Sequence, residues 1–185
     1  ELPEGDRLAA LTARLGERHG VRVQVLPHRD MGVSLRHYDR HRRKLMISEL
    51  VEPPGRAFQA AYQAGLIEAA GPVEQALDVA GLAEGPARRL GRVTLLNYVA
   101  AAVLMPYVPF LAGAQETGYD VDLLAARFGA SWEQVAHRLT TLARPSARGV
   151  PFFMIRVDAA GNVSKRFASG AFPFARMGGT CPRWN

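Results

Sequence analysis

The chain has 185 residues, one cysteine and a net charge of +6, and 48% of its residues are hydrophobic. This composition supplies enough apolar material for a packed core and excludes wholesale disorder. A single cysteine excludes an internally disulfide-bonded scaffold. The longest apolar run, Leu95 to Leu111, is interrupted by Pro106 and Pro109 and is shorter than the roughly 18 residues of a membrane span. No membrane partner and a cytoplasmic location are therefore expected.

The first part of the chain predicts one helix and a small antiparallel sheet. Asp6 to His19 carries leucines at helical spacing, with Asp6 as the N-cap and Gly20 as the stop. Three short segments then show the alternating or clustered apolar residues of strands, separated by turns, and this order favours antiparallel pairing. The three segments are Val21–Val25, Gly32–Tyr38 and Lys44–Ile47.

The next part of the chain predicts a series of helices. Pro106 is expected to kink or break the longest of them, because proline lacks the N–H that a helix interior needs. The order of one helix, a sheet and then several helices describes an α+β domain. The helices are expected at about 55–70, 73–80, 86–111, 120–128 and 131–142.

A change of composition at Arg144–Gly149 predicts a domain boundary. Beyond it, Val150–Val157 and Val163–Phe167 resemble two strands joined by the hairpin turn Asp158–Asn162. The chain has no initiator Met and ends without a closing element, so we expect it to be an internal piece of a longer protein. The predicted parts are a domain of residues 1–145 and the start of a second, β-rich domain, residues 146–185.

The residues themselves show no clear catalytic or metal-binding motif. His37 and His41 are four positions apart but fall in a predicted strand and turn, so a surface loop is favoured over a metal site. Nucleophile, phosphate-loop and dinucleotide patterns are missing. The segment 36–44 carries five permanent positive charges and one negative charge, which fits either a solvated loop or a patch for an anion. Lys165 and Arg166 are a second basic pair, and only one of them can face a given site, because neighbours on a strand point in opposite directions.

The segment Arg56–Leu66 resembles the metal-binding helix of the ImmA/IrrE family of metallopeptidase-like domains. Tyr62, Gln63 and Leu66 stand where that family has the first histidine, the glutamate and the second histidine of its His-Glu-x-x-His motif. Val93 stands where the third ligand, a glutamate, is expected. All four replacements remove what zinc and its activated water require. The resemblance therefore implies a degenerate peptidase fold that binds no zinc and is not an enzyme.

Three later segments resemble the ScfR-type (short-chain fatty acyl) transcriptional regulators. That resemblance implies that coenzyme A or a short-chain acyl-CoA is the effector, and that a helix-turn-helix domain outside this chain binds DNA. It also implies a GAF-like second domain, in which Cys181 joins cysteines outside this chain in holding a 4Fe-4S cluster. A homodimer is expected, because such regulators often match two-fold operators. The three segments are Gly149–Phe153, Asp158–Phe167 and Gly178–Asn185.

Under this resemblance the disused metal site becomes the predicted ligand site. Tyr62, Gln63 and Leu66 would line it, since they occupy the former ligand face. Phe58 and Tyr98 would pack on the pantetheine arm or the adenine, with ordinary core packing as the alternative.

The phosphates of coenzyme A require arginine or lysine partners. Lys165 and Arg166 are the first choice, because they lie in the family-specific segment. The second choice is the basic group Arg42, Arg43 and Lys44.

Together these expectations describe an acyl-CoA-sensing effector domain of a transcriptional regulator of short-chain fatty acid metabolism. The pathways concerned would be those of propionate and acetate, namely the methylcitrate and glyoxylate pathways. Ligand binding would act by population shift, changing how the DNA-binding domain is presented. The alternatives are a protein-interaction or dimerisation module with no small ligand, and a residual metallopeptidase.

Overall fold

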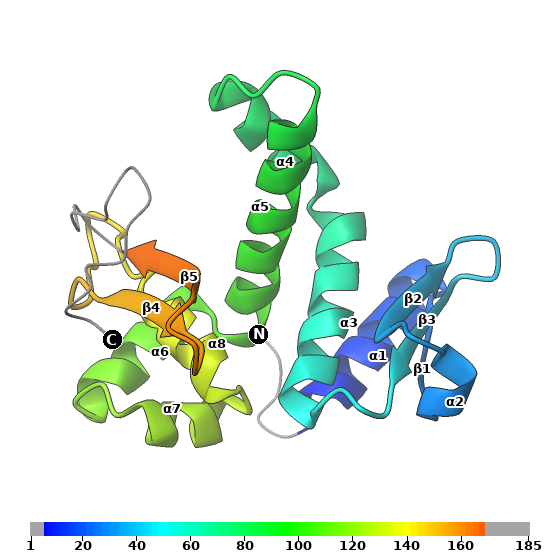
Figure 1. Cartoon of the computed structure of the whole chain (residues 1–185), viewed down its shortest axis with the longest axis horizontal. Coiled ribbons are helices and arrows are strands. Elements are labelled where there is room, and N and C mark those ends of the chain that lie inside the picture. The colour runs from blue at the N-terminus through cyan, green and yellow to red at the C-terminus, as the bar shows by residue number, and fades with distance from the viewer. Residues whose placement is uncertain (1–5, 169–185) are drawn as a thin grey trace. The chain divides into compact units, whose positions relative to one another are not determined.

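The fold is described by a computed structural model, which places residues 6–168 (Figure 1). This part of the chain contains eight helices and five strands, which confirms the predicted α+β class. It folds into two compact units. The first holds the chain up to Pro106 together with Ala126–Ser131, and the second holds Tyr107–Ala125 and the chain from Trp132 onward. The elements are α1 (Arg7–His19), β1 (Arg22–Leu26), α2 (His28–Met31), β2 (Arg36–Asp39), β3 (Lys44–Ser48), α3 (Pro53–Glu68), α4 (Ala70–Val79), α5 (Pro86–Leu104), α6 (Tyr107–Glu116), α7 (Val121–Phe128), α8 (Trp132–Leu139), β4 (Phe153–Val157) and β5 (Val163–Ala168).

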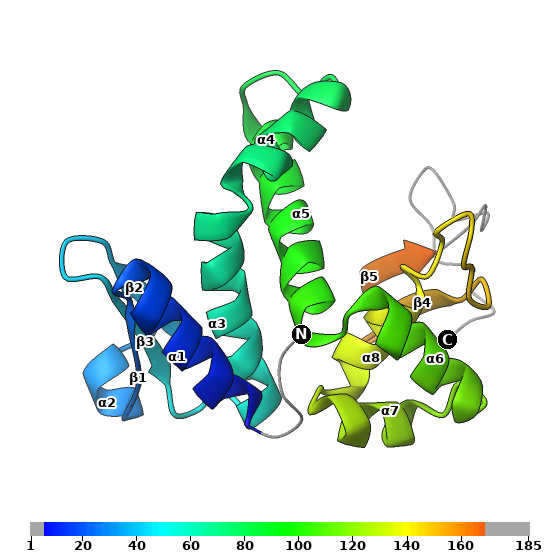
Figure 2. The ribbon, with the colours of Figure 1, turned by 180° about the vertical axis from the view of Figure 1, so that it is seen from behind.

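Helix α1 forms as its caps predict. The Asp6 carboxylate accepts a hydrogen bond from the Ala9 N–H at 3.1 Å, and Gly20 ends the helix with a φ of +63°. Leu11 and Leu15 are fully buried on the inner side. Helix α1 lies against both α3 and the sheet, as the view from behind shows (Figure 2).

The sheet of the first unit is mixed, so the prediction of an antiparallel sheet is wrong for one of its two pairs. The strand order is β1-β3-β2, with β2 antiparallel and β1 parallel to β3. Strand β3 is central because it carries the apolar side chains Leu45 and Ile47, both fully buried. Between β1 and β2 the chain forms α2, which the sequence analysis did not predict. The predicted strand from Gly32 shortens to Arg36–Asp39, and Val33 is fully exposed.

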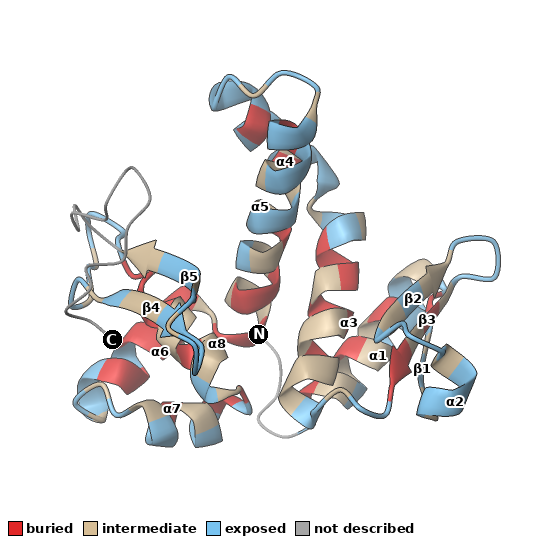
Figure 3. Cartoon of the chain, in the orientation of Figure 1, coloured by how far each residue is buried: buried red, intermediate tan, exposed pale blue. Residues whose placement is uncertain are grey.

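Small side chains of α3 and larger apolar side chains of α4 and α5 pack these three helices together. A Cβ built on Gly65 of α3 would lie only 3.1 Å from Val99 Cγ1 of α5, so the two helices approach closely there. Val73, Leu77 and Leu96 form the apolar cluster between α4 and α5. Figure 3 shows buried residues in all three helices. The buried alanines of α3 are Ala57, Ala60, Ala61 and Ala64.

The predicted break falls where the first unit ends, and the second unit contains the predicted hairpin. Helix α5 ends at Leu104 and α6 begins at Tyr107, which confirms the break at Pro106. Strands β4 and β5 pair in antiparallel fashion, and the Asp158 carboxylate accepts from the Ala160 and Asn162 N–H groups in the turn. The GAF-like character of this part stays a prediction.

The compact units do not follow the division predicted at residue 145. Tyr107 of α6 donates its hydroxyl proton to the Ala147 carbonyl at 2.8 Å and accepts from the Arg144 N–H at 3.0 Å. Tyr119 and Phe152 are in ring contact, with centroids 5.3 Å apart. Elements from both sides of residue 145 therefore share one unit, and the domain boundary stays a prediction.

Within the described chain, no single helix is long and apolar enough to cross a membrane. Helices α5 and α6 meet that length and hydropathy requirement only when they are counted together, as core helices of soluble proteins also do.

Candidate functional site

The predicted ligand site lies on α3, where three of the predicted residues follow one stripe. Phe58, Tyr62 and Leu66 are four residues apart and so lie on one side of the helix. Phe58 is half-buried, Tyr62 packs on the cluster between α4 and α5, and Leu66 is exposed. Gln63, beside Tyr62, is buried with only 1% exposure.

Arg36 reaches this stripe from the edge strand β2. Its Nη2 donates a short hydrogen bond to Gln63 Oε1, and its guanidinium carbon lies 5.4 Å from the centroid of the Tyr62 ring. Strand alternation explains the direction of this side chain, because Arg36 and Tyr38 are half-buried while His37 between them is exposed. The residues Arg36, Tyr62 and Gln63, which we call the Arg36 cluster, therefore join β2 to α3.

The positive charge of Arg36 is not neutralised within the cluster. Burial lowers the pKa of Arg36, but an arginine remains charged at neutral pH. Its Nε is buried and has no hydrogen-bond partner among residues 6–168, and no carboxylate of that range pairs with it. The cluster thus contains a cation whose polar partner is a neutral amide.

This arrangement does not fit a zinc ion. The positions that the resemblance assigns to the zinc ligands and the base carry Tyr62, Gln63, Leu66 and Val93, which lack the imidazole and carboxylate donors of a zinc site. The Arg36 guanidinium places a positive charge beside Gln63, which opposes the binding of a dication. Within the described part of the chain, histidine, cysteine and acidic side chains form no group of three that could hold a metal ion.

The second-choice basic residues lie at the other end of the β2–β3 pair from Arg36. Arg36 pairs with Ile47, whereas Asp39 pairs with Lys44, about 10 Å further along the strands. Arg42 is exposed and is held to Asp39 through its backbone N–H at 2.9 Å. The structure therefore places Arg42, Arg43 and Lys44 in the same unit as the Arg36 cluster but not within it.

The first-choice basic residues lie in the second compact unit. Lys165 of β5 makes a short ion pair with Glu133 of α8, and Arg156 lies 3.3 Å from the same carboxylate. The hydrogen bond from Lys165 is the main reason that the pKa of Glu133 is lowered. Arg166 is exposed and points to the other face of the strand. Lys165 is thus already partnered, and its predicted role as a phosphate ligand stays a prediction.

Tyr98, another predicted residue, does not join the cluster either. Tyr98 is 43% exposed and lies about 200° around α5 from Leu96, whose side chain faces Gly65 of α3. Its ring therefore points away from the α3 contact. Cys181 lies outside the described residues.

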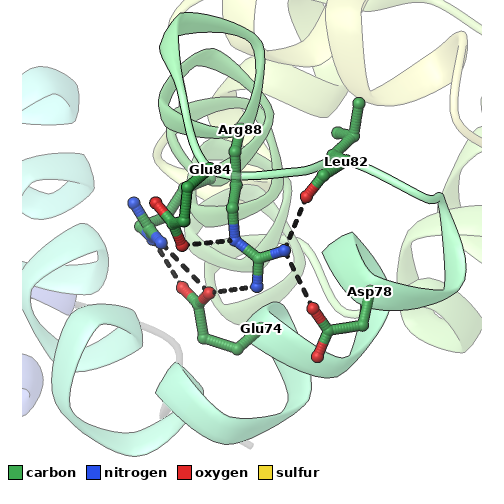
Figure 4. A network of polar contacts seen from close by, with 6 residues as sticks. Glu74, Asp78, Leu82, Glu84 and Arg88 are labelled. Atoms are coloured by element: carbon green, nitrogen blue, oxygen red, sulfur yellow. Dashed lines mark hydrogen bonds and ion pairs between the residues drawn. The ribbon is translucent and has the colours of Figure 1, made fainter.

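A buried arginine of the first unit, Arg88, has acidic side chains around it, unlike Arg36. Arg88 of α5, which is 8% exposed, lies between Glu74 at 2.7 Å, Asp78 at 2.8 Å and Glu84 at 3.3 Å (Figure 4). It also donates to the Leu82 carbonyl at 2.7 Å. Hydrogen bonds from Arg92 and Arg88 lower the pKa of Glu74 to about 2. These carboxylates neutralise the charge of Arg88, and the network ties α4 to α5. Arg88 Nε, like Arg36 Nε, has no hydrogen-bond partner among residues 6–168, but it lies 3.3 Å from the Glu84 carboxylate.

Arg36 belongs to the basic segment 36–44 but was not predicted as a site residue. The available signal was the alternation in β2, where an arginine and a tyrosine share the inner face. The missing information was the contact with Gln63, which lies 27 positions away.

Comparisons with known proteins give the same two families as the sequence. The family pattern described as the IrrE N-terminal-like domain matches residues 16–140. The pattern described as the C-terminal region of the short-chain fatty acyl coenzyme A regulators matches residues 141–185.

Several relatives carry regulatory names. A propionyl-CoA carboxylase regulator of Cereibacter sphaeroides is 48% identical over 141 residues, covering 76% of this chain and 31% of that protein. Two HTH-type transcriptional regulators of Mycobacterium tuberculosis, RamB and PrpR, are 41% and 39% identical over 182 and 184 residues. They cover 98% and 97% of this chain, and the chain spans 38% of each.

A solved structure has the same fold. A Mycobacterium tuberculosis transcriptional regulator matches 98% of this chain and 55% of its own chain, with a TM-score of 0.91 and 37% identity. The chain thus spans about a third of its curated relatives and about half of this solved chain.

Proposed function

Because the chain belongs to the family of IrrE N-terminal-like domains, we propose that it is the acyl-CoA-sensing effector region of a transcriptional regulator. The metabolism controlled would be that of short-chain fatty acids such as propionate and acetate. Two findings support this proposal: the match of residues 141–185 to the short-chain fatty acyl coenzyme A regulators and the regulatory names of the relatives. The DNA-binding role would belong to a helix-turn-helix domain outside this chain.

The observation that carries the proposal is the Arg36 cluster, which includes Tyr62 and Gln63, two of the positions that the resemblance assigns to the zinc ligands and the base. A zinc peptidase needs a dication there and a glutamate to activate water. Gln63 cannot act as that base, and Arg36 favours an anion over a cation. An acyl-CoA is an anion with an apolar acyl chain, so a cation beside the Tyr62 ring suits it. The chain would therefore bind a ligand and perform no catalysis.

Binding would act by differential affinity. An acyl-CoA that binds one arrangement of β2 and α3 better than another shifts their populations and so changes how the DNA-binding domain is presented. The size of the effect is limited by the difference in affinity between the two arrangements.

The proposed iron–sulfur cluster needs ligands beyond this chain. Cys181 is the one cysteine of the sequence, and a 4Fe-4S cluster requires four thiolates or equivalent ligands. Such a cluster would supply a redox-sensitive anchor in the full-length protein, while the residues of this chain bind the effector.

Native mass spectrometry of the purified chain, with and without propionyl-CoA, tests the proposal. We expect a complex with the mass of one acyl-CoA per chain, and calorimetry should give a dissociation constant in the micromolar range or tighter. A chain that stays free of ligand at millimolar propionyl-CoA would overturn the proposal, and stoichiometric zinc would favour the peptidase.

The same spectra test the interaction-module alternative, which one observation favours. Val33, Leu35 and Leu50 are exposed apolar side chains near the edge strand β2, and the Ser48 N–H donates to the Leu35 carbonyl at 3.0 Å. A dimer without any acyl-CoA binding would support a dimerisation module through this edge.

A further inference from the structure

The surroundings of Arg36 differ from those of other arginines in the first compact unit. Arg14 donates to both carboxylate oxygens of Glu68, and Arg88 pairs with three acidic residues. Arg56 donates to two backbone carbonyls. Arg36 is half-buried with a neutral amide oxygen as its hydrogen-bond acceptor.

The hydrogen-bond donor of Arg36 that has no acceptor lies on a defined edge of its guanidinium. The Nε–H and one Nη2–H of an arginine point in parallel, and this edge matches the two oxygens of a carboxylate or phosphate. In this chain Gln63 Oε1 accepts from Nη2, while Nε is buried without a partner among residues 6–168. One of the two donors on this edge therefore has an acceptor and the other has none. A buried donor without an acceptor costs free energy.

We infer that Arg36 is the oxyanion-recognition residue of this domain, and that a carboxylate or phosphate group displaces Gln63 from its Nε–Nη2 edge. The inference rests on the proposed function in one respect only, namely that the oxyanion belongs to the sensed molecule. Displacement of Gln63 would break the hydrogen bond between β2 and α3. Binding at Arg36 would thereby change the contact that joins the sheet to α3.

Gln63 at the former glutamate position is essential to this role. A glutamate there would fill the same edge of Arg36 with a permanent carboxylate and neutralise it. The amide keeps the site polar and leaves the positive charge available. Gln63→Glu should therefore weaken anion binding although it preserves the size of the side chain.

The test compares variants of the whole 185-residue chain by calorimetry with four probes: propionyl-CoA, coenzyme A, propionate and inorganic phosphate. We expect Arg36→Gln and Gln63→Glu each to weaken binding at least tenfold, because a charge-assisted hydrogen bond is lost. Circular dichroism identifies any variant that fails to fold, and the near-isosteric Gln63→Glu keeps the test valid if Arg36→Gln unfolds. The matched controls are Arg29→Gln, whose arginine is 85% exposed, and Gln75→Glu on the exposed face of α4, and both should bind as the parent chain does.

The probes separate the sources of the oxyanion. Binding of coenzyme A or phosphate that depends on Arg36 assigns a phosphate, and binding of propionate that depends on Arg36 assigns a carboxylate. Unchanged propionyl-CoA binding in both Arg36→Gln and Gln63→Glu would overturn the inference and leave the proposed function intact. Arg36-dependent binding of phosphate or propionate without propionyl-CoA binding would support the inference and overturn the proposed function. No binding of any probe by the parent chain would overturn both.

Discussion

Arg36 and Arg88 show how neighbouring side chains decide what a partly or fully buried arginine does. Both belong to the first compact unit, where Arg88 is buried and Arg36 is half-buried. Arg88 lies among three carboxylates, so its charge is compensated and its contribution is structural. Arg36 has an amide and an aromatic ring as neighbours, so its charge remains available to a ligand. The difference is one of partner chemistry and could not be read from the two arginines alone.

The Glu74 carboxylate makes the stability of the chain depend on pH in acid. Its pKa falls from 4.5 to about 2 in the folded chain, because Arg92 and Arg88 donate hydrogen bonds to the ionised form. This contribution to stability is present above pH 4.5 and is lost as the pH falls toward 2, since the folded state must then take up a proton at a cost.

We expect Glu74→Gln to lower the melting temperature at neutral pH and to flatten its decrease between pH 4.5 and 2. Glu17→Gln is the matched control, because Glu17 is exposed on α1 and no partner is described for it. Thermal unfolding followed by circular dichroism at several pH values measures both effects. If the melting temperatures of the parent chain and of Glu74→Gln decrease equally between pH 4.5 and 2, the role assigned to this network is contradicted.

The helices of this chain were predictable because their signals are local. The N-cap and stop of α1, the break before α6 and the turn between β4 and β5 each depend on residues within a few positions. The parallel pairing of β1 with β3 depends instead on α2 and the following loop, which carry the chain to the far edge of the sheet. Neighbouring strands usually pair with each other, so the sequence favoured the wrong arrangement. Two residues of the predicted site, Tyr62 and Gln63, do lie beside a cation. That cation is Arg36, and not one of the predicted basic residues. The strand order that places β2 beside β3 brings Arg36 to α3.

The close approach of α3 and α5 depends on Gly65. A Cβ at this position would already lie 3.1 Å from Val99 Cγ1, so the extra atoms of a leucine have no room. We expect Gly65→Leu to destabilise the chain by about 1–3 kcal/mol through overpacking. The control is Gly71→Leu in α4, where nothing lies within 4 Å of a built Cβ and leucine favours the helix. Denaturant unfolding of both variants gives the comparison, and equal effects at the two glycines would refute the close contact.

At the scale of the whole chain, sequence families and compact units divide the molecule differently. The family patterns meet at residues 140 and 141, close to the predicted boundary at 145. The second compact unit nevertheless combines α6 and α8 with the hairpin that follows. His137 of α8 stacks on Phe167 with ring centroids 4.0 Å apart, and Glu133 pairs with Lys165 and Arg156. A family boundary therefore need not be a folding boundary in this chain.

A chain shortened to residues 1–145 tests this point directly. It would lose the Ala147 carbonyl that accepts from Tyr107, the ring that contacts Tyr119 and the hairpin that packs on α8. Helices α6 and α8 would then expose surface that the 185-residue chain covers, while α1, α3 and α5 keep their own contacts. We expect hydrogen exchange to show lost protection in α6 and α8 and unchanged protection in α1, α3 and α5. A chain ending at Ala168 is the control, because it keeps these contacts. Equal protection of α6 and α8 in both shortened chains would instead place the folding boundary at residue 145, where the sequence predicted it.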